Sequence, residues 1–213
     1  LLGQLMAAYE MNQFKDEYQK AVIQNAKSFA RSLKAEGLDV MGDPAIDYTE
    51  THQVIVSVGY GEGAEIAERL EQNNVIVNYR PPPEEEGFTA SGALRMGVSE
   101  MTRFGFGEKE FAQLASLMAD CILRGKEIGP DVAKLRAQHL EMGYCFNDAQ
   151  FEDALEKLGI TEKVNSEGKK VSAYDQAINM VYSKGYKIYT TQNPKYQKIA
   201  EDVCYNLENI PYT

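Results

Sequence analysis

The sequence is poor in the residues that most often mark a disulfide framework or a metal site. Its 213 residues include no tryptophan, two histidines and three cysteines. Cys121, Cys145 and Cys204 are odd in number and widely spaced, so we expect free thiols in a reducing compartment, which favours a cytoplasmic location. His52 and His139 have no cysteine or acidic partners at the spacing of metal ligands or of a catalytic triad. We therefore predict no metal site and a structural role for both histidines.

Basic residues and long apolar runs are also scarce. The chain has 22 lysines and arginines against 32 acidic residues, a formal net charge of −10 and an isoelectric point near 4.8. Proteins that bind nucleic acid generally carry a basic patch, so this charge argues against DNA or RNA as a partner. The sequence has no window of roughly 18 consecutive apolar residues, the length of a membrane span, and we predict no membrane segment.

The first residues, LLGQLMAAYEM, form an apolar helical stripe without an initiator methionine. Because such a stripe needs a partner surface, we interpret Leu1 as an internal start and expect an N-terminal portion before it. The apolar spacing continues to Leu33 and predicts one long amphipathic helix that ends at Gly37.

Two short strands with a helix between them are predicted next. Alternating valines in HQVIVSV, residues 52–58, are typical of a strand with one buried face. A glycine-rich turn leads into a short helix with apolar residues at 66–70. The β-branched run VIVNY, residues 75–79, predicts the second strand.

Prolines and small residues mark the boundaries that follow. PPPEEEG at 81–87 fits a stiff, exposed loop. TASGALRMGV at 89–98 predicts a turn that feeds a third strand, and a helix across 111–122 should end at Gly125. Pro130 is well placed to start another helix. Together these elements predict an α/β fold in which a short sheet is packed by helices in two layers.

The composition changes near residue 147, and seven of the thirteen tyrosines lie beyond it. Three segments, at 148–159, 172–185 and 193–207, have helical patterns with polar or proline-containing starts, and a polar break, NSEGKK, occupies 165–170. We therefore divide the chain into a domain of residues 1–146 and a mostly helical extension of residues 147–213, whose role the pattern does not indicate.

The glycine-rich turn at 59–64 also matches the G-x-G-x-x-G/A pattern of dinucleotide-binding turns. Two features argue against nucleotide binding there. Glu62 would place a carboxylate beside a bound pyrophosphate, and no acid for a ribose hydroxyl lies at the end of the second strand. Nucleotide binding remains the lesser alternative, since glycine turns between strands and helices are common.

Arg95 stands in SGALRMG, where small residues precede it and apolar residues flank it. A planar guanidinium matches a carboxylate through two parallel hydrogen bonds, which suits it to anchor an amino-acid substrate. On spacing alone, an arginine beside a strand is more often a solvated residue or an ion-pair partner. Both interpretations stay open on the residues alone.

Several blocks in fixed order carry a resemblance to a known family. NAKSFARSLKAEGLDV, THQVIVSV, GEGAEIAERLEQNNVIVNYR and TASGALRMGVSEMTRFGF follow one another between residues 25 and 106. This order is similar to the small C-terminal domain of serine hydroxymethyltransferase, where the counterparts run approximately NAKALAEALLERGY, NHLVLVDL, EAEELLERAGITVNKN and TSGIRIGTPAMTTRG. The resemblance covers about two thirds of the chain and leaves the extension unexplained.

The resemblance implies a fold type I enzyme that uses pyridoxal phosphate in one-carbon and amino-acid metabolism. It places Arg95 on the arginine that holds the α-carboxylate of serine or glycine. The Schiff-base lysine of the family belongs to the larger N-terminal domain and has no counterpart here, so the chain should contain no catalytic residue and be inactive alone. The implied partners are that missing domain or another subunit of a homo-oligomer.

The chain departs from the family pattern at two positions near this arginine. SGIRIGT becomes SGALRMGV, with Ala93 as an insertion, and VNKN becomes VNYR, so that Arg80 replaces an asparagine near the folate site. Asn78, Arg80 and Ser91 are possible site-lining residues, and use of tetrahydrofolate is uncertain. A pyridoxal-phosphate-dependent aldolase acting on β-hydroxy amino acids is one alternative. A non-catalytic α/β binding or regulatory module is the other.

Overall fold

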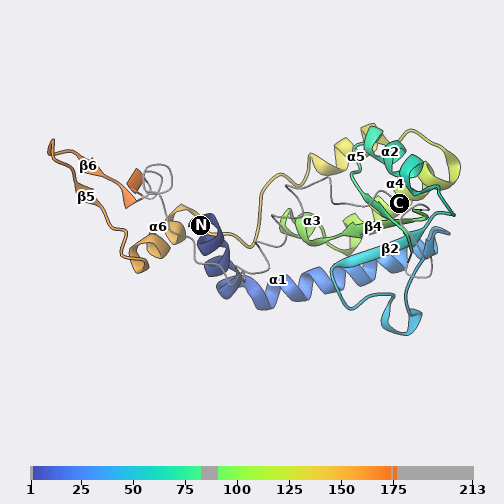
Figure 1. Ribbon diagram of the computed structural model, residues 1–213, viewed down its shortest axis with the longest axis horizontal. Coiled ribbons are helices and arrows are strands. Elements are labelled where there is room, and N and C mark those ends of the chain that lie inside the picture. Colours follow the sequence, from blue (N-terminus) through green and yellow to red (C-terminus); the bar gives the residue numbers. More distant parts are fainter. Residues whose placement is uncertain (1, 83–90, 174, 177–213) are drawn as a thin grey trace, which may run out of the picture. The chain divides into compact units, whose positions relative to one another are not determined.

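The computed structural model describes residues 2–82, 91–173, 175 and 176. Contacts between residues divide the chain into two compact units, Ala7–Asn147 and a smaller one formed by Leu1–Met6 together with Asp148–Thr213. The elements of the larger unit, labelled in Figure 1, are α1 (Leu2–Ala35), whose first residues belong to the smaller unit, β1 (Asp39–Val40), the 3-10 helix Pro44–Ile46, β2 (Gln53–Ser57), α2 (Gly63–Gln72), β3 (Asn78–Arg80), β4 (Ala93–Gly97), α3 (Ser99–Arg103), α4 (Glu108–Arg124) and α5 (Gly129–Arg136).

The larger unit is built on a four-stranded sheet with the strand order β1-β2-β4-β3 and antiparallel pairing throughout. β4 is a central strand, because β2 pairs with it on one side and β3 on the other. Arg95, in the middle of β4, is opposite Ile55 of β2 and Asn78 of β3. The arginine of the sequence motif is thus held in a paired strand and not in a loop.

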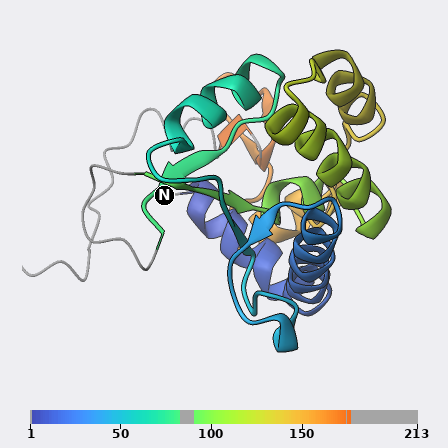
Figure 2. The ribbon, with the colours of Figure 1, turned by 90° about the vertical axis from the view of Figure 1, so that its right-hand side faces the viewer.

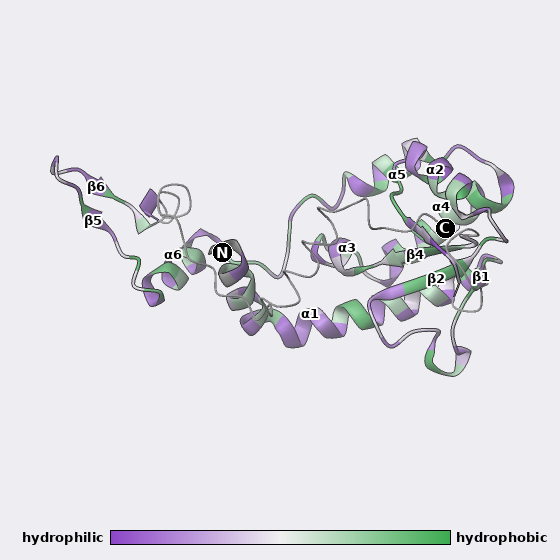
Figure 3. Ribbon diagram, viewed as in Figure 1, coloured by the Kyte–Doolittle hydropathy of each residue, from purple (hydrophilic) through white to green (hydrophobic). Residues whose placement is uncertain are grey.

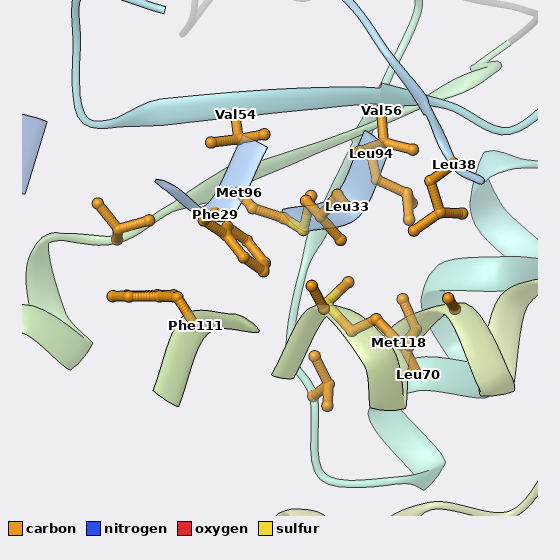
Figure 4. Close-up of a cluster of buried hydrophobic side chains, with 14 of the residues drawn as sticks. Phe29, Leu33, Leu38, Val54, Val56, Leu70, Leu94, Met96, Phe111 and Met118 are labelled. Atoms are coloured by element: carbon orange, nitrogen blue, oxygen red, sulfur yellow. The ribbon is translucent and has the colours of Figure 1, made fainter. Parts of the chain in front are cut away.

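One face of this sheet forms the core. Val54 and Val56 of β2 and Leu94 and Met96 of β4 are buried on that face. Helices cover it with Phe29 and Leu33 of α1, Leu70 of α2, and Phe111 and Met118 of α4, as Figure 4 shows. A register slip of one residue would turn all four strand residues away from the helices. Burial of each large apolar side chain stabilises the fold by about 1.5–3 kcal/mol. Because Arg95 alternates with the buried Leu94 and Met96, this core keeps Arg95 on the opposite face.

Most predicted helix boundaries are confirmed. α1 ends at Ala35, two residues before Gly37, whose φ is 95°. α4 ends at Gly125 in the left-handed region, and Pro130 occupies the first turn of α5. Figure 3 shows apolar and polar residues alternating along α1, and the rings of Phe29 and Phe111 hold α1 and α4 together at a centroid distance of 5.2 Å. Figure 2 shows these two helices on the same side of the sheet.

The prediction of a strand over 75–79 is wrong in its first half. β3 begins at Asn78 and ends at Arg80. The backbone N–H of Val75 donates to Leu70 O at the end of α2, so it is committed to closing the helix. Ile76, the next residue, is 85% exposed. β-branched residues favour a strand. Here, however, Val75 belongs to the end of α2, so the strand is shorter than the β-branched run.

The smaller unit contains α6 (Asp148–Lys157), β5 (Lys163–Val164) and β6 (Lys170–Val171). The helix predicted at 148–159 is confirmed. The polar break at 165–170 is the turn of a two-stranded hairpin, where Asn165 Oδ1 accepts hydrogen bonds from Glu167 N at 3.0 Å and Lys169 N at 2.9 Å. Strands of two residues are too short for a periodic signal, so the sequence predicted only the break.

Of the other two helices predicted for the extension, at 172–185 and 193–207, the structure describes only the start of the first. At 172–185, Ser172 Oγ accepts a hydrogen bond from Asp175 N at 3.0 Å, as an N-terminal cap does. The rest of that segment, beyond residue 176, and the helix predicted at 193–207 lie outside the described residues.

Candidate functional site

The sheet face opposite the core collects the residues that the sequence singled out. Because opposed residues of an antiparallel ladder share a face, Asn78 lies on the same face as Arg95, and Arg80 joins them two residues further along β3. The described strand residues of this open face are Asp39, Gln53, Ile55, Ser57, Asn78, Arg80, Ala93, Arg95 and Gly97. Three of the four predicted site residues are therefore neighbours.

Arg95 is half-buried, and the part of the chain described here offers its guanidinium no hydrogen-bond or ion-pair partner. Its neighbours in sequence, Leu94 and Met96, are 0% and 7% exposed on the opposite face, and its backbone is paired on both sides. A rigid backbone and an uncommitted planar cation are the properties of a positioned anion receptor.

Asn78 and Arg80 are linked to each other on this face. Arg80 Nε donates to Asn78 Oδ1 at 3.1 Å, and both side chains are exposed. The bond leaves the terminal nitrogens of Arg80 and the amide nitrogen of Asn78 without an acceptor among the described residues. Donors therefore outnumber acceptors around Arg95.

Ser91 has a different position from the other three. It precedes β4 by two residues and its carbonyl accepts a hydrogen bond from Gly63 N at 2.8 Å, at the start of α2. A Cβ on Gly63 would lie 2.3 Å from that carbonyl oxygen, so the approach needs glycine. Gly63 belongs to the motif considered for dinucleotide binding, and its N–H is used here to join α2 to the strand instead of binding a phosphate.

A buried network that the sequence analysis missed anchors the segment after β4. Asn25 of α1 is 5% exposed, and its Nδ2 donates to Thr102 Oγ1 at 3.0 Å and to Phe106 O at 2.8 Å. Thr102 Oγ1 in turn donates to Val98 O at 2.8 Å. An asparagine inside the apolar stripe of a predicted helix was the available signal, since a buried amide needs partners.

Arg103 holds a second connection between distant segments. Its Nη2 donates to Glu10 Oε2 at 3.1 Å and to Tyr144 O at 2.9 Å, and the other oxygen of Glu10 accepts from Phe146 N at 3.1 Å. A cleft of about 570 Å³ lies beside these contacts, and Asn25, Arg103 and Tyr144 are among the residues that line it. Arg95 is not among the residues that line this cleft.

The histidines and the one described buried thiol lie in ordinary surroundings. His139 Nδ1 is 3.2 Å from Phe104 O and its ring packs against Phe106, which fits a structural role. His52 is exposed beside Gly97 at the end of the open face. Burial raises the pKa of the Cys121 thiol above its usual range, so this cysteine is not an activated nucleophile.

The described ranges contain neither a candidate metal site nor a candidate membrane span. Three or more histidine, cysteine, aspartate or glutamate side chains do not gather there in an arrangement suited to a metal ion. Of the helices in the same part of the chain, none is long and apolar enough to cross a membrane.

Comparison with known proteins gives this geometry a family. A family model described as serine hydroxymethyltransferase matches residues 4–118, more than half of the chain. The chain belongs to the serine hydroxymethyltransferase family. Serine hydroxymethyltransferases of Pyrobaculum arsenaticum and Sulfolobus acidocaldarius are 38% and 36% identical to it over 64% and 67% of its length. These matches cover 32% and 34% of the relatives, so the chain spans about a third of their length.

A solved structure agrees with this assignment. The L-threonine transaldolase from Pseudomonas fluorescens, crystallised in the internal aldimine state, matches 72% of this chain and 36% of its own with 28% identity and a TM-score of 0.61. It is a fold type I pyridoxal-phosphate enzyme. The predicted α/β fold, a short sheet packed by helices, is confirmed, and so is the resemblance to serine hydroxymethyltransferase.

The open face was tested for its fit to pyridoxal phosphate. None of the nine described strand residues on it is a lysine, the residue that binds this cofactor covalently. The face instead offers cations and amide donors, which suit an anionic substrate group. The residues present therefore fit a substrate-binding role beside a cofactor that another part of the protein would hold.

Proposed function

We propose that this chain is the C-terminal portion of a pyridoxal-phosphate-dependent enzyme of the serine hydroxymethyltransferase type, and that Arg95 binds the α-carboxylate of its amino-acid substrate. The family match over residues 4–118 supports this, because it includes the whole open face. The cofactor-binding lysine would belong to the part of the relatives, about two thirds of their length, that this chain does not cover. We expect the chain alone to be inactive.

The observation that supports this proposal most directly is that Arg95 has no counter-ion among the described residues, whereas several other arginines have one. Four other arginines form ion pairs with acidic side chains at 3.1 Å or less, namely Arg31, Arg69, Arg103 and Arg124. Arg95 is half-buried and lacks such a partner among the described residues. A partly buried cation without a partner is costly, so a bound anion is the natural complement.

The geometry of the strand supports an orienting role for Arg95. Its planar fork accepts a carboxylate through two parallel, charge-assisted hydrogen bonds, and the paired backbone keeps that fork in place. Pyridoxal phosphate, when bound, supplies the electron sink for cleavage of a bond at Cα. Holding the carboxylate would fix Cα relative to the reacting groups. Arg95 would then contribute to the rate by positioning the substrate. A domain that covers the face would exclude water and strengthen the pair.

Two reactions fit this arrangement. Membership of the serine hydroxymethyltransferase family favours transfer of a one-carbon unit between serine and glycine, with tetrahydrofolate as acceptor. The similarity to an L-threonine transaldolase favours the alternative, an aldol-type reaction of a β-hydroxy amino acid without folate. Release of aldehyde from a β-hydroxy amino acid by the full-length protein, with and without tetrahydrofolate, separates the two.

The open face also supports a proposal about partners. Ile55, a large apolar side chain, stays half-buried at its centre beside Arg95. An N-terminal pyridoxal-phosphate domain or another subunit of a homo-oligomer would cover it, and we propose a cytoplasmic enzyme with an amino-acid substrate. Burial of the face in the intact protein would remove the solvent that surrounds Asn78 and Arg80 here.

Kinetics of the full-length protein containing this chain test the assignment. Arg95→Lys keeps the charge but loses the fork, so kcat/KM for the amino acid should fall by at least tenfold, mainly through KM. Arg69→Lys is the matched control, because Arg69 forms an exposed pair with Glu65 on α2. If the two variants lower kcat/KM equally, Arg95 has a structural role. If the full-length protein shows no activity that depends on pyridoxal phosphate, a non-catalytic module is favoured.

A further inference from the structure

Two arginines, and not one, face the same open surface. Arg80 is opposite Ala93, and Asn78 is opposite Arg95, so Arg80 and Arg95 are diagonal neighbours on adjacent strands. Diagonal neighbours in an antiparallel pair lie about 7–8 Å apart. Both backbones are held in the ladder, so this spacing belongs to the fold and not to a mobile loop.

The described strand residues of this face include no acid at close range to balance these charges. Its one described acidic residue, Asp39 of β1, is opposite Ser57, two strands from β4 and three from β3. At about 4.8 Å for each strand spacing, it lies roughly 10 Å or more from both guanidinium-bearing strands. Asp39 is also within 3.4 Å of Lys34 Nζ.

The orientation of Arg80 leaves its terminal nitrogens for a ligand. Asn78 Oδ1 accepts from Arg80 Nε at 3.1 Å, and this contact steers Arg80 along the strand toward the residue opposite Arg95. The Asn78 amide nitrogen faces the same surface and has no acceptor among the described residues. Three donor groups therefore lie on one face, with Asn78 directly opposite Arg95 and two residues from Arg80 along β3.

Like charges at this spacing repel, and the repulsion grows as a covering domain removes water. Arginine cannot relieve it by losing a proton, since its pKa lies far above neutrality. Among the described strand residues of the face no nearby acid balances the two charges, so an anion bound there would relieve the repulsion. If Arg95 receives the α-carboxylate, a second anionic group remains for Arg80.

We propose that Arg80 is a second anion-binding residue, which selects a co-substrate carrying a carboxylate or a phosphate in addition to the α-carboxylate of the amino acid held at Arg95. This inference rests on the proposed function of Arg95. The second anion belongs to an aldehyde with an acidic group or to the glutamate tail of a folate, two sources of the same chemistry.

The test uses the full-length protein with glycine and matched pairs of aldehydes. In the reaction, glycine loses a proton from Cα and that carbon bonds to the aldehyde carbon, whose oxygen becomes a hydroxyl group. Succinic semialdehyde is compared with butyraldehyde, and glycolaldehyde phosphate with glycolaldehyde. Arg80→Asn should lower the ratio of kcat/KM for the charged over the uncharged aldehyde by about tenfold or more, the scale of one charge-assisted hydrogen bond.

A second arm measures tetrahydrofolate. A rise of similar size in KM for tetrahydrofolate on Arg80→Asn, with a larger rise for a polyglutamyl form, identifies the folate tail as the source. Arg80→Lys keeps the charge, so it should retain much of the preference that Arg80→Asn loses, in whichever arm responds. If Arg80→Lys loses the preference as fully as Arg80→Asn does, a role in anion binding is contradicted.

Two outcomes overturn the inference. If Arg80→Asn lowers kcat/KM for charged and uncharged co-substrates by the same factor, Arg80 either shares one anion with Arg95 or has a structural role. If replacement of Glu84, Glu85 and Glu86 by glutamine lowers the melting temperature as Arg80→Asn does, and neither variant changes the ratio, these acids are the partners of Arg80. Failure of the proposed function is distinct, because Arg95→Lys would then leave KM for glycine unaffected whatever Arg80 does.

Discussion

At the scale of single residues, Arg103 joins the end of α3 to both α1 and the segment after α5. Its pair with Glu10 is only 25% and 18% exposed at the side chains, and both partners also hold backbone groups at Tyr144 and Phe146. A partly buried, hydrogen-bonded pair stabilises more than an exposed one, because loss of either partner leaves a desolvated charge and orphaned backbone groups.

We therefore predict that Arg103→Ala lowers the free energy of unfolding by about 1–3 kcal/mol in urea titrations. The control is Arg69→Ala, which removes an exposed pair with Glu65 and should cost under about 1 kcal/mol. A double-mutant cycle with Glu10→Ala should show coupling. Equal losses for Arg103→Ala and Arg69→Ala would contradict the prediction.

Cys121 gives a pH dependence of known sign. Burial raises the pKa of its thiol, so the folded state holds the proton more tightly than the unfolded chain. The contribution to stability is fully present below the unfolded pKa, about 8.5, and is lost as pH rises toward the folded value. We expect stability to decline above about pH 8.5, and Cys121→Ala to flatten that decline even if it lowers stability overall.

Alkylation mapped by mass spectrometry checks the same point independently. Cys121 should react more slowly than the half-buried Cys145 in the folded protein, and the difference should vanish in denaturant. Faster reaction at Cys121 in native conditions would show that its thiol is neither buried nor shifted.

At the scale of elements, one asparagine connects two helices. Asn73 ends α2 and is 2% exposed, and its Oδ1 accepts from Ile128 N at 2.6 Å and Gly129 N at 2.9 Å at the start of α5. It therefore serves as an N-terminal cap for α5 from a different helix.

Asn73→Ala should destabilise the protein by about 1–3 kcal/mol, because two backbone N–H groups lose their acceptor. Asn74→Gly is the matched control, since Asn74 is exposed, its contact with Gly129 O measures 3.5 Å and glycine tolerates its φ of 66°. Thermal unfolding monitored by circular dichroism distinguishes them. The cap is refuted if both variants melt together.

The elements differ in how far the sequence predicts them. α1 and α4 were predictable because their apolar spacing spans many turns and glycines stop them. β3 was predicted to begin three residues too early, because the hydrogen bond from Val75 N to Leu70 O closes α2 and keeps Val75 out of the ladder. In the site, Arg95 was identified from the family resemblance. Its diagonal relation to Arg80 became known only from the register of β3 and β4.

At the scale of the whole molecule, the two faces of the sheet differ in what they present. The core face buries its strand residues under helices, while the other face presents Arg95, Asn78 and Arg80 to whatever covers it. The chain spans about a third of its relatives' length, and in the proposed function catalysis belongs to the assembled protein and substrate orientation to this face.

The most direct measurement compares an amino acid with the same molecule lacking its carboxylate. In the full-length protein, dissociation constants of serine and ethanolamine are taken from the change in cofactor absorbance, for the native enzyme and for Arg95→Ala. We expect Arg95→Ala to weaken serine binding by about 2–5 kcal/mol and to leave ethanolamine binding much less affected, so that the preference for serine is lost. A preserved preference for serine over ethanolamine in Arg95→Ala would contradict the role of Arg95 as the carboxylate anchor.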